Sequence, residues 1–335
     1  MTSDAFHPAS DSSPTVDAPP PAVIDAAIEA AQDNAPATLV LVLETDGSTY
    51  AQAGGMALFG PGEAQTGWLS GGCLEPEIAR RAAQAAVHGR LDWMEIDTRD
   101  DDALLSGSAL GCRGRLRLAL LPLSALADMQ LPLQSWRGGG VALQIAIARD
   151  GAVAISAGTD RRNWQLPTSP PDWDAAPAWS LSIAAPPELL LCGGGPETPM
   201  LLPLLRRLGW QTTLVERRVR WTPMAAFADR HRSDGLDAVL AGDTRFDAVL
   251  LMHHNFELDL EALLALAPVP VPFVGLLGPV RRREDLFRVL PEALHASLRP
   301  RLQSPVGLDL GGRGADAIAL SIAAQLQAWW HGRTP

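Results

Sequence analysis

Short apolar runs separated by turn residues dominate the N-terminal half of the chain. The run at 38–44, TLVLVLE, precedes a glycine-containing loop and two shorter runs that turn at Pro61-Gly62. We interpret these runs as strands. A helix is expected after Cys73, because acidic residues occupy its first turn and Gly89 follows its end. We also predict a short helix at 23–32, strands at 115–123, 141–148 and 178–185, and an exposed loop at 156–178.

From residue 188 the pattern changes to short apolar runs that alternate with helix-like segments. The runs ELLLC, TTLVE, DAVLA, DAVLLM and PFVGLLG begin at 188, 212, 237, 247 and 272. This alternation predicts a doubly wound parallel sheet. The expected fold class is therefore α/β, with an N-terminal mixed α/β domain and a C-terminal Rossmann-like doubly wound parallel sheet.

A chain of 335 residues is long for one domain, so two domains are the better expectation. Residues 1–20 consist mainly of Ser, Asp, Pro and Ala, a composition that predicts a disordered tail. We assign 21–186 to the N-terminal domain, including a connecting region rich in Pro and Trp, and 187–335 to the Rossmann-like domain.

Composition excludes several classes of function. A net charge of −11 argues against general binding of nucleic acid or an anionic membrane, both of which favour a basic surface. All 27 basic residues are Arg, so mechanisms that need a lysine, such as a Walker phosphate loop or a Schiff base, are excluded. The sequence shows no signal peptide and no apolar run long enough to span a bilayer. Together with three sparse cysteines, this predicts a cytoplasmic protein with reduced thiols.

The first candidate site is the segment Ser70-Gly71-Gly72-Cys73 at the start of the predicted helix. Consecutive glycines before a helix can offer backbone amides to an anion. A thiol at a helix N-terminus is a better nucleophile or soft-metal ligand than an ordinary cysteine. Glu75 lies in the first helical turn. A tight turn around a small buried cysteine would produce the same pattern, so both interpretations remain open.

A second thiol, Cys112, lies between Gly111 and Arg113 just before a predicted strand. Two glycine-flanked cysteines in one domain are consistent with a shared pocket, although buried structural cysteines are also common. Their separation does not match a zinc site.

The C-terminal half contains a dinucleotide-type turn. Gly193-Gly194-Gly195 follows a strand directly, and Glu216 ends the next strand at about the spacing of a ribose-binding acid. However, Thr198 replaces the third glycine of the fingerprint, and Pro203 lies inside the predicted helix. The pattern predicts Rossmann architecture more firmly than it predicts a nicotinamide cofactor.

Further candidates follow the later strands of this domain. His253 and His254 end a strand, where an open parallel sheet faces its ligand. The run Arg281, Arg282 and Arg283 could bind phosphate or could equally be a solvated helix face. Asp309 belongs to a glycine-rich loop before the last helix, where helix capping would also explain the glycines.

Taken in order, these segments resemble the XdhC/CoxI family, the accessory factors of xanthine dehydrogenase and related molybdenum hydroxylases. The resemblance covers about residues 38–325. It rests on ETDGSTYAQAGG, GWLSGGCLEPEIARRA, LGCRGRLRLAL, LLLCGGGPETPMLLPLLRRLGWQTTLVERR, LMHHNFELD, VGLLGPVRRRE and PVGLDLGGRGADAIALSI.

The resemblance implies a chaperone that binds the molybdenum cofactor, assists its sulfuration and inserts it into an apo molybdenum hydroxylase of the xanthine dehydrogenase type. A cysteine desulfurase would supply the sulfur, no turnover of its own is expected, and a homodimer would suit such a carrier. The cofactor that the resemblance implies is molybdopterin or its nucleotide form, and Cys73 and Cys112 are then the candidate contacts to its molybdenum or sulfur. The candidate cofactor-binding residues are Ser48, Ser70, Gly71, Gly72, Cys73, Glu75, Cys112, Gly193, Gly195, Glu216, His253, His254, Arg281, Arg282, Arg283 and Asp309.

One departure from the family pattern affects the first of these segments. Ala51 and Gln52 stand where the family usually carries a basic residue, so one contact to an anionic cofactor is expected to be missing or replaced. The alternatives are an NAD(P)-dependent oxidoreductase that uses Glu216, and an interaction scaffold that has lost its site.

Overall fold

The computed structural model of the chain describes residues 15–16, 21–99, 113–174 and 176–332. The predicted tail at 1–20 and Cys112 therefore fall largely or wholly outside the described residues. The chain divides into two compact units, Met1–Ala185 and Pro186–Pro335, next to the boundary expected at Pro186-Pro187. Among the described residues, each unit contains two hydrophobic clusters of its own.

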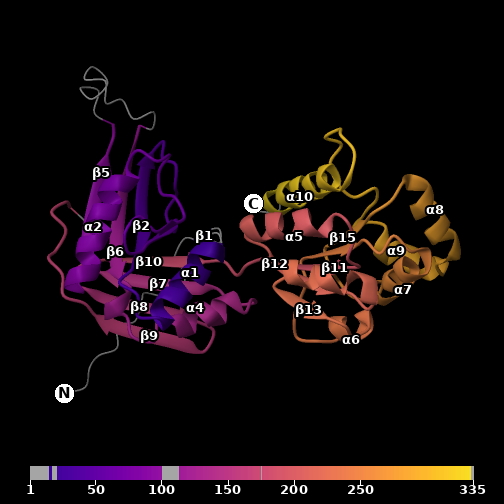
Figure 1. Ribbon diagram of the computed structural model, residues 1–335, viewed down its shortest axis with the longest axis horizontal. Coiled ribbons are helices and arrows are strands. Elements are labelled where there is room, and N and C mark those ends of the chain that lie inside the picture. The colour runs from indigo at the N-terminus through magenta and orange to yellow at the C-terminus, as the bar shows by residue number, and fades with distance from the viewer. Residues whose placement is uncertain (1–14, 17–20, 100–112, 175, 333–335) are drawn as a thin grey trace. The chain divides into compact units, whose positions relative to one another are not determined.

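The N-terminal unit contains two mainly antiparallel sheets (Figure 1). One has the order β4-β3-β2-β6-β5 and the other the order β1-β10-β7-β8-β9. The strands are β1 (Thr15–Val16), β2 (Thr38–Gly47), β3 (Met56–Phe59), β4 (Gln65–Thr66), β5 (Asp92–Asp97), β6 (Gly114–Pro122), β7 (Leu143–Ala148), β8 (Ala152–Ala157), β9 (Asp160–Gln165) and β10 (Ala178–Ile183). The helices are α1 (Pro21–Gln32), α2 (Glu75–His88) and α4 (Gln130–Arg137), with a short 3-10 turn, η1 (Leu123–Ala125).

Strand β2 is buried on both faces, which explains its continuous apolar run. Leu39 and Leu41 pack into the core that α1, α4 and the second sheet share, whereas Val40 and Val42 face the core beneath α2. Successive side chains of a strand point to opposite faces, so one strand contributes to two cores.

The prediction of an exposed loop at 156–178 is partly wrong. Strands β8 and β9 form a hairpin within 152–165, and β8 pairs with β7 as well. The residues of β9, DRRNWQ, are mostly polar because β9 is the edge strand of its sheet, and this polarity hid it from a hydrophobic pattern.

The C-terminal unit is a six-stranded parallel sheet in the order β13-β12-β11-β14-β15-β16. This is the Rossmann order, in which the first and fourth strands of the fold meet at the topological switch point. The strands are β11 (Glu188–Cys192), β12 (Gln211–Val215), β13 (Arg230–Arg232), β14 (Ala248–Leu251), β15 (Phe273–Leu276) and β16 (Leu302–Gln303). The helical segments are α5 (Thr198–Arg207), η2 (Val219–Phe227), α6 (Leu236–Leu240), α7 (Phe256–Leu266), α8 (Val280–Val289), η3 (Glu292–Leu294), α9 (His295–Leu298) and α10 (Ala315–His331).

Helices cover both faces of this sheet (Figure 1). Leu189 and Leu191 pack with α5 and α10, whereas Leu190 and Cys192 pack with α7 and α8. The doubly wound parallel sheet predicted from the sequence is confirmed. Within the described part of the chain, no helix is long and apolar enough to cross a membrane.

The prediction of one strand in this domain is wrong. DAVLA, at 237–241, lies in the short helix α6 and the turn after it, and the third strand is instead the polar segment Arg230–Arg232. β13 is the outer strand of the sheet and pairs only with β12, so its side chains need no apolar alternation.

Candidate functional sites

In the N-terminal unit, Ser48, Ser70 and Cys73 line one small cavity together with Tyr50 and Gly114. Ser48 follows β2, Cys73 precedes α2, and Gly114 begins β6. The cavity is close to 20 Å³, about the space of one water molecule. Residues that are distant in the sequence thus meet around a thiol that is exposed to solvent.

Gly114 allows the chain to close around this cavity. A Cβ atom at Gly114 would lie 2.5 Å from the carbonyl oxygen of Ser48, which no side chain could tolerate. The close approach of the two backbones therefore requires glycine.

The buried side chain of Glu75 fixes the loop that contains Gly71 and Gly72. Its buried carboxylate accepts hydrogen bonds from the amides of Leu69 (3.2 Å) and Ser70 (2.8 Å), and from the Ser70 hydroxyl. Burial by itself would raise the pKa of Glu75, but these hydrogen bonds outweigh it and hold the pKa below its ordinary value. Glu75 is therefore a charged internal anchor of the loop.

The Ser70 hydroxyl organises the rest of the loop. Its oxygen accepts from the amides of Gly72 and Leu74, each at 3.2 Å, and lies 3.8 Å from the Cys73 sulfur. Among the described residues, the amides of Gly71 and Cys73 have no hydrogen-bond partner. The loop thus keeps two of its amides available beside the thiol, whereas the amide of Gly72 is used internally.

Sequence patterns did not single out every residue of this site. Tyr50, which is 61% exposed, and Thr98 line the same cavity. The only Tyr of the chain, placed just after Ser48, was a signal that could have found it. Cys112, which was expected to share this pocket with Cys73, lies outside the described residues.

In the C-terminal unit, the glycine turn lies at the switch point but is satisfied internally. The amide of Gly193 donates to Val215, that of Gly194 to Glu216 at 2.7 Å, and that of Gly195 to the Thr198 hydroxyl at 2.9 Å. A dinucleotide diphosphate normally binds such amides. Here none of the three amides is directed to an external anion.

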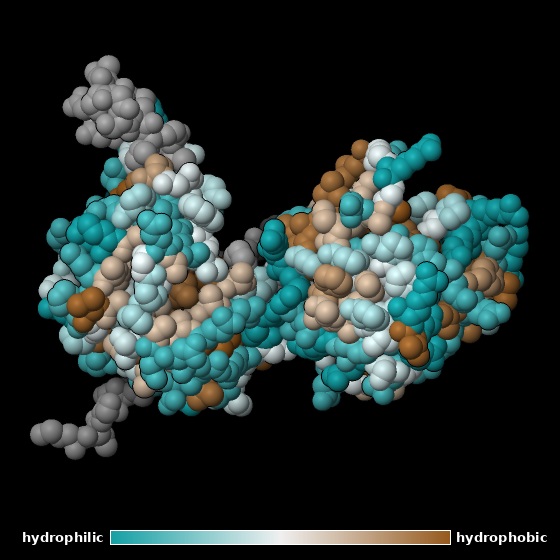
Figure 2. Space-filling view, viewed as in Figure 1, coloured by the Kyte–Doolittle hydropathy of each residue, from teal (hydrophilic) through white to brown (hydrophobic). Residues whose placement is uncertain are grey.

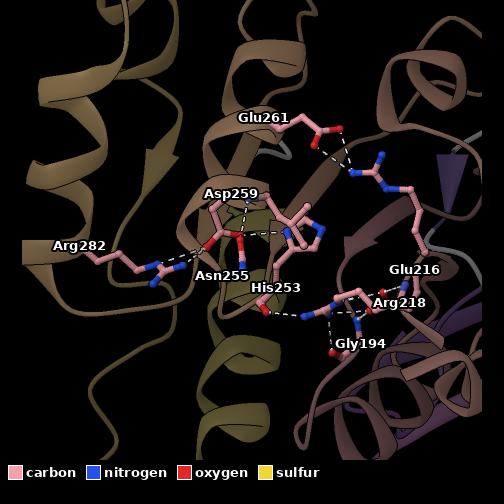
Figure 3. Close-up of polar contacts among 10 residues, drawn as sticks. Gly194, Glu216, Arg218, His253, Asn255, Asp259, Glu261 and Arg282 are labelled. Carbon is pink, nitrogen blue, oxygen red and sulfur yellow. Dashed lines mark hydrogen bonds and ion pairs between the residues drawn. The ribbon is translucent and has the colours of Figure 1, made fainter. Parts of the chain in front are cut away.

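Glu216, the acid that follows β12, also has its hydrogen-bond partners inside the protein. Glu216 is buried, and its two oxygens accept from the guanidinium of Arg218 at 2.7 and 3.0 Å and from the Arg218 amide at 2.7 Å. Arg218 also donates to the carbonyl oxygens of Gly194 and His253 (Figure 3). Burial would raise the pKa of Glu216, but the bonds from Arg218 and the amides keep it below its ordinary value. Glu216 therefore acts as the internal partner of Arg218.

His253 faces a second buried carboxylate. Its Nδ1 lies 2.9 Å from Oδ1 of Asp259, whose other oxygen accepts from Arg282 at 2.6 Å. His253 and Arg282 approach Asp259 from opposite sides (Figure 3). The Nε2 of His253 has no hydrogen-bond partner in the described chain. This arrangement fixes the imidazole and leaves its second nitrogen without a partner in the described chain.

His254 takes a separate role from its neighbour. It has a positive φ of 53°, and its Nε2 lies 3.3 Å from the buried carboxylate of Glu197. This hydrogen bond raises the pKa of His254. The two histidines therefore diverge, and each contacts its own acid.

The three consecutive arginines do not form one cluster. Successive residues of a helix point about 100° apart, and on α8 each guanidinium meets a different environment. Arg282 pairs with Asp259, and Arg283 donates to the carbonyl of Ser304 at 2.7 Å. Arg281 is 89% exposed, with Asp285 at 3.7 Å.

Asp309 lines a different cavity, of about 330 Å³, beside the carboxyl end of β15. It is not among the residues around the glycine turn. Among the described residues, no group of three or more His, Cys, Asp and Glu side chains could hold a metal ion.

The fold and these sites define a two-domain α/β protein. Its C-terminal half has Rossmann topology and an internally bonded glycine turn, and its N-terminal half presents a loop-borne thiol. The chain belongs to the XdhC and CoxI family: residues 30–95 match the model of that family, and residues 189–326 match the XdhC Rossmann domain.

Two relatives extend the similarity over nearly the whole chain. A protein from Bacillus subtilis (strain 168), named as a probable xanthine dehydrogenase subunit, is 25% identical over 327 residues, covering 91% of this chain and 95% of the relative. A crystal structure described as a xanthine dehydrogenase from Bacillus halodurans superposes with a TM-score of 0.74 at 23% identity. It covers 93% of this chain and 97% of the solved one, and it supports the fold.

Proposed function

We propose that this protein is an accessory factor of a xanthine dehydrogenase-type molybdenum hydroxylase. It binds the molybdenum cofactor as cargo, holds it while a cysteine desulfurase provides the terminal sulfur, and inserts it into the apo-enzyme. Membership in the XdhC and CoxI family and the name of the Bacillus subtilis relative support the association with xanthine dehydrogenase.

The observation that carries the proposal is the exposed Cys73 thiol beside Ser48 and Ser70. Thiolates are the soft ligands that suit molybdenum–sulfur chemistry, and the amides of Gly71 and Cys73 would stabilise negative charge next to it. Glu75 contributes by fixing the loop from its buried side. The residues present therefore fit a sulfur-rich anionic cargo.

The test is loading and delivery. The full chain is loaded with the molybdenum cofactor, a cysteine desulfurase with L-cysteine supplies the terminal sulfur, and activation of an apo molybdenum hydroxylase is measured. Cys73→Ala should retain less cofactor and activate less apo-enzyme, whereas Cys192→Ala, which removes a buried thiol, should behave like the parent. If Cys73→Ala delivers active cofactor as well as the parent does, the thiol assignment is wrong; if the parent neither binds nor delivers it, the function is wrong.

The contacts of the glycine turn weigh against the oxidoreductase alternative. Glu216 would have to release Arg218 before it could accept a ribose hydroxyl, and the turn amides would have to leave their present acceptors. We expect no saturable binding in an NADH fluorescence titration. Micromolar binding of NADH without binding of molybdopterin would reverse this choice.

A further inference from the structure

A cavity near the start of α10 shares no lining residue with the two sites described above. It measures about 330 Å³, at the lower end of the range for ligand pockets. Its walls are the turn after β15 and the loop 305–312, closed by the first turns of α10. It lies at the carboxyl edge of the parallel sheet, the edge at which this architecture binds ligands.

The wall formed by the loop is anchored to α10. The amide of Leu308 donates to the carbonyl of Ser321 at 3.1 Å, and the Ser321 hydroxyl donates back to the carbonyl of Leu308. The amide of Gly307 donates to Gln325 at 2.6 Å. These bonds fix the cavity before a ligand arrives, which lowers the entropic cost of binding.

Most of the side chains that line the cavity are apolar, and some of them face solvent. Leu277, Val306 and Ile318 contribute to the walls, and Leu308 and Leu310 are 40% and 54% exposed. Figure 2 shows hydrophobic side chains gathered over α10 and the loop that precedes it. A flat apolar body would cover these side chains and remove their surface from water.

Two charged side chains of the loop have no partner among the described residues. Asp309 lines the cavity, and Arg313 follows Gly312 of the same wall. Neither forms a hydrogen bond or an ion pair with any residue in the described ranges. In the same part of the described chain, the amides of Gly311 and Gly312 also lack acceptors, in contrast to the glycine turn at Gly193.

We propose that this cavity binds a flat nitrogen heterocycle that carries an anionic group. Asp309 accepts the paired N–H donors of an aminopyrimidinone edge, and Arg313 pairs with the anion. If the proposed function holds, on which this assignment of the natural ligand rests, the heterocycle is the pterin of the cargo and the anion is its phosphate.

The experiment measures binding to the full chain with two probes, molybdopterin and the fluorescent compound pterin-6-carboxylate. Ala317→Phe fills the cavity, and Ala328→Phe adds the same side chain at an exposed position of the same helix. Asp309→Asn and Arg313→Gln remove the charges, with Asp234→Asn and Arg288→Gln as exposed controls in the same domain.

We expect Ala317→Phe to abolish binding of pterin-6-carboxylate, and each loop substitution to weaken it about tenfold, as for loss of a hydrogen bond to a charged group. The three controls should bind like the parent. If Ala317→Phe and Asp309→Asn both bind pterin-6-carboxylate as tightly as the parent does, the inference is overturned.

The two proposals fail in different ways. If Ala317→Phe still binds molybdopterin and activates the apo-enzyme like the parent, the cavity assignment is wrong and the function stands. If the parent binds pterin-6-carboxylate in the Ala317-dependent way but neither holds molybdopterin nor activates the apo-enzyme, the cavity is a heterocycle site and the function is wrong.

Discussion

The guanidinium of Arg218 donates to both carboxylate oxygens of Glu216, at 2.7 and 3.0 Å, and fixes that acid beside the glycine turn. Glu216 is almost fully buried, so its charge depends on this partner and on the amide of Gly194. A Rossmann acid that would otherwise meet a ribose has become part of the framework of the domain.

Loss of Arg218 should therefore destabilise the C-terminal domain. We expect Arg218→Met to lower the free energy of unfolding by about 3 kcal/mol, because a buried carboxylate is left without its cation. Urea unfolding followed by Trp fluorescence measures this. Arg217→Met is the control: Arg217 pairs with Glu261, both are about half exposed, and the expected change is below about 1 kcal/mol. Equal effects of the two substitutions would contradict the buried role of Glu216.

Glu75 should stabilise the Cys73 loop through its charge. Glu75→Gln is expected to cost about 1–3 kcal/mol, since the neutral amide is a weaker acceptor for the three donors. The folded pKa of Glu75 is lowered, so its contribution is present above the unfolded value near 4.5 and is lost as the pH falls through the folded value. Unfolding of the parent should accordingly show a steeper loss of stability in acid than unfolding of Glu75→Gln. Glu63→Gln, at an exposed position of the same domain and without a hydrogen-bond or ion-pair partner among the described residues, should leave the acid profile steep.

His254 should titrate above its ordinary value. The hydrogen bond to Glu197 is the main cause of the raised pKa of His254 in the folded state. The contribution of this contact to folding stability is therefore complete below the unfolded pKa of about 6.5, and it is lost as the pH rises through the folded pKa. Its side chain is about half exposed, which keeps the effect on stability small. NMR titration of the imidazole should show the pKa falling in Glu197→Gln and unchanged in Glu257→Gln. An unchanged pKa in Glu197→Gln would contradict the contact.

Thiol labelling should distinguish Cys73 from Cys192. Cys73 is exposed, whereas Cys192 is buried in the core of the sheet, and burial raises the pKa of its thiol. Brief treatment of the native protein with iodoacetamide, followed by peptide mass spectrometry, should show modification at Cys73 and none at Cys192. Labelling in urea provides the control, because both thiols should then react. Native labelling at Cys192 would show that this core opens readily.

Local patterns predicted a large part of the architecture. Alternation of apolar runs with helical segments was sufficient for the parallel sheet, because a buried parallel strand is apolar along its whole length. The same reasoning failed at Arg230–Arg232 and Asp160–Gln165, where edge strands carry polar residues. Hydrogen bonds to a neighbouring strand, and not hydrophobicity, decide those two elements.

The sequence by itself also determined the family and the presence of glycine loops, a thiol and acids near strand ends. Only the tertiary structure decided which of these groups remain available. It places Ser48, Ser70 and Cys73 around one cavity, whereas Glu216, Arg282 and the amides of Gly193 and Gly194 are used inside the domain. Residue spacing specifies where a polar group lies along the chain. Its hydrogen-bond partner is set by long-range packing, because a buried polar group must be satisfied by whichever donor or acceptor the fold brings beside it.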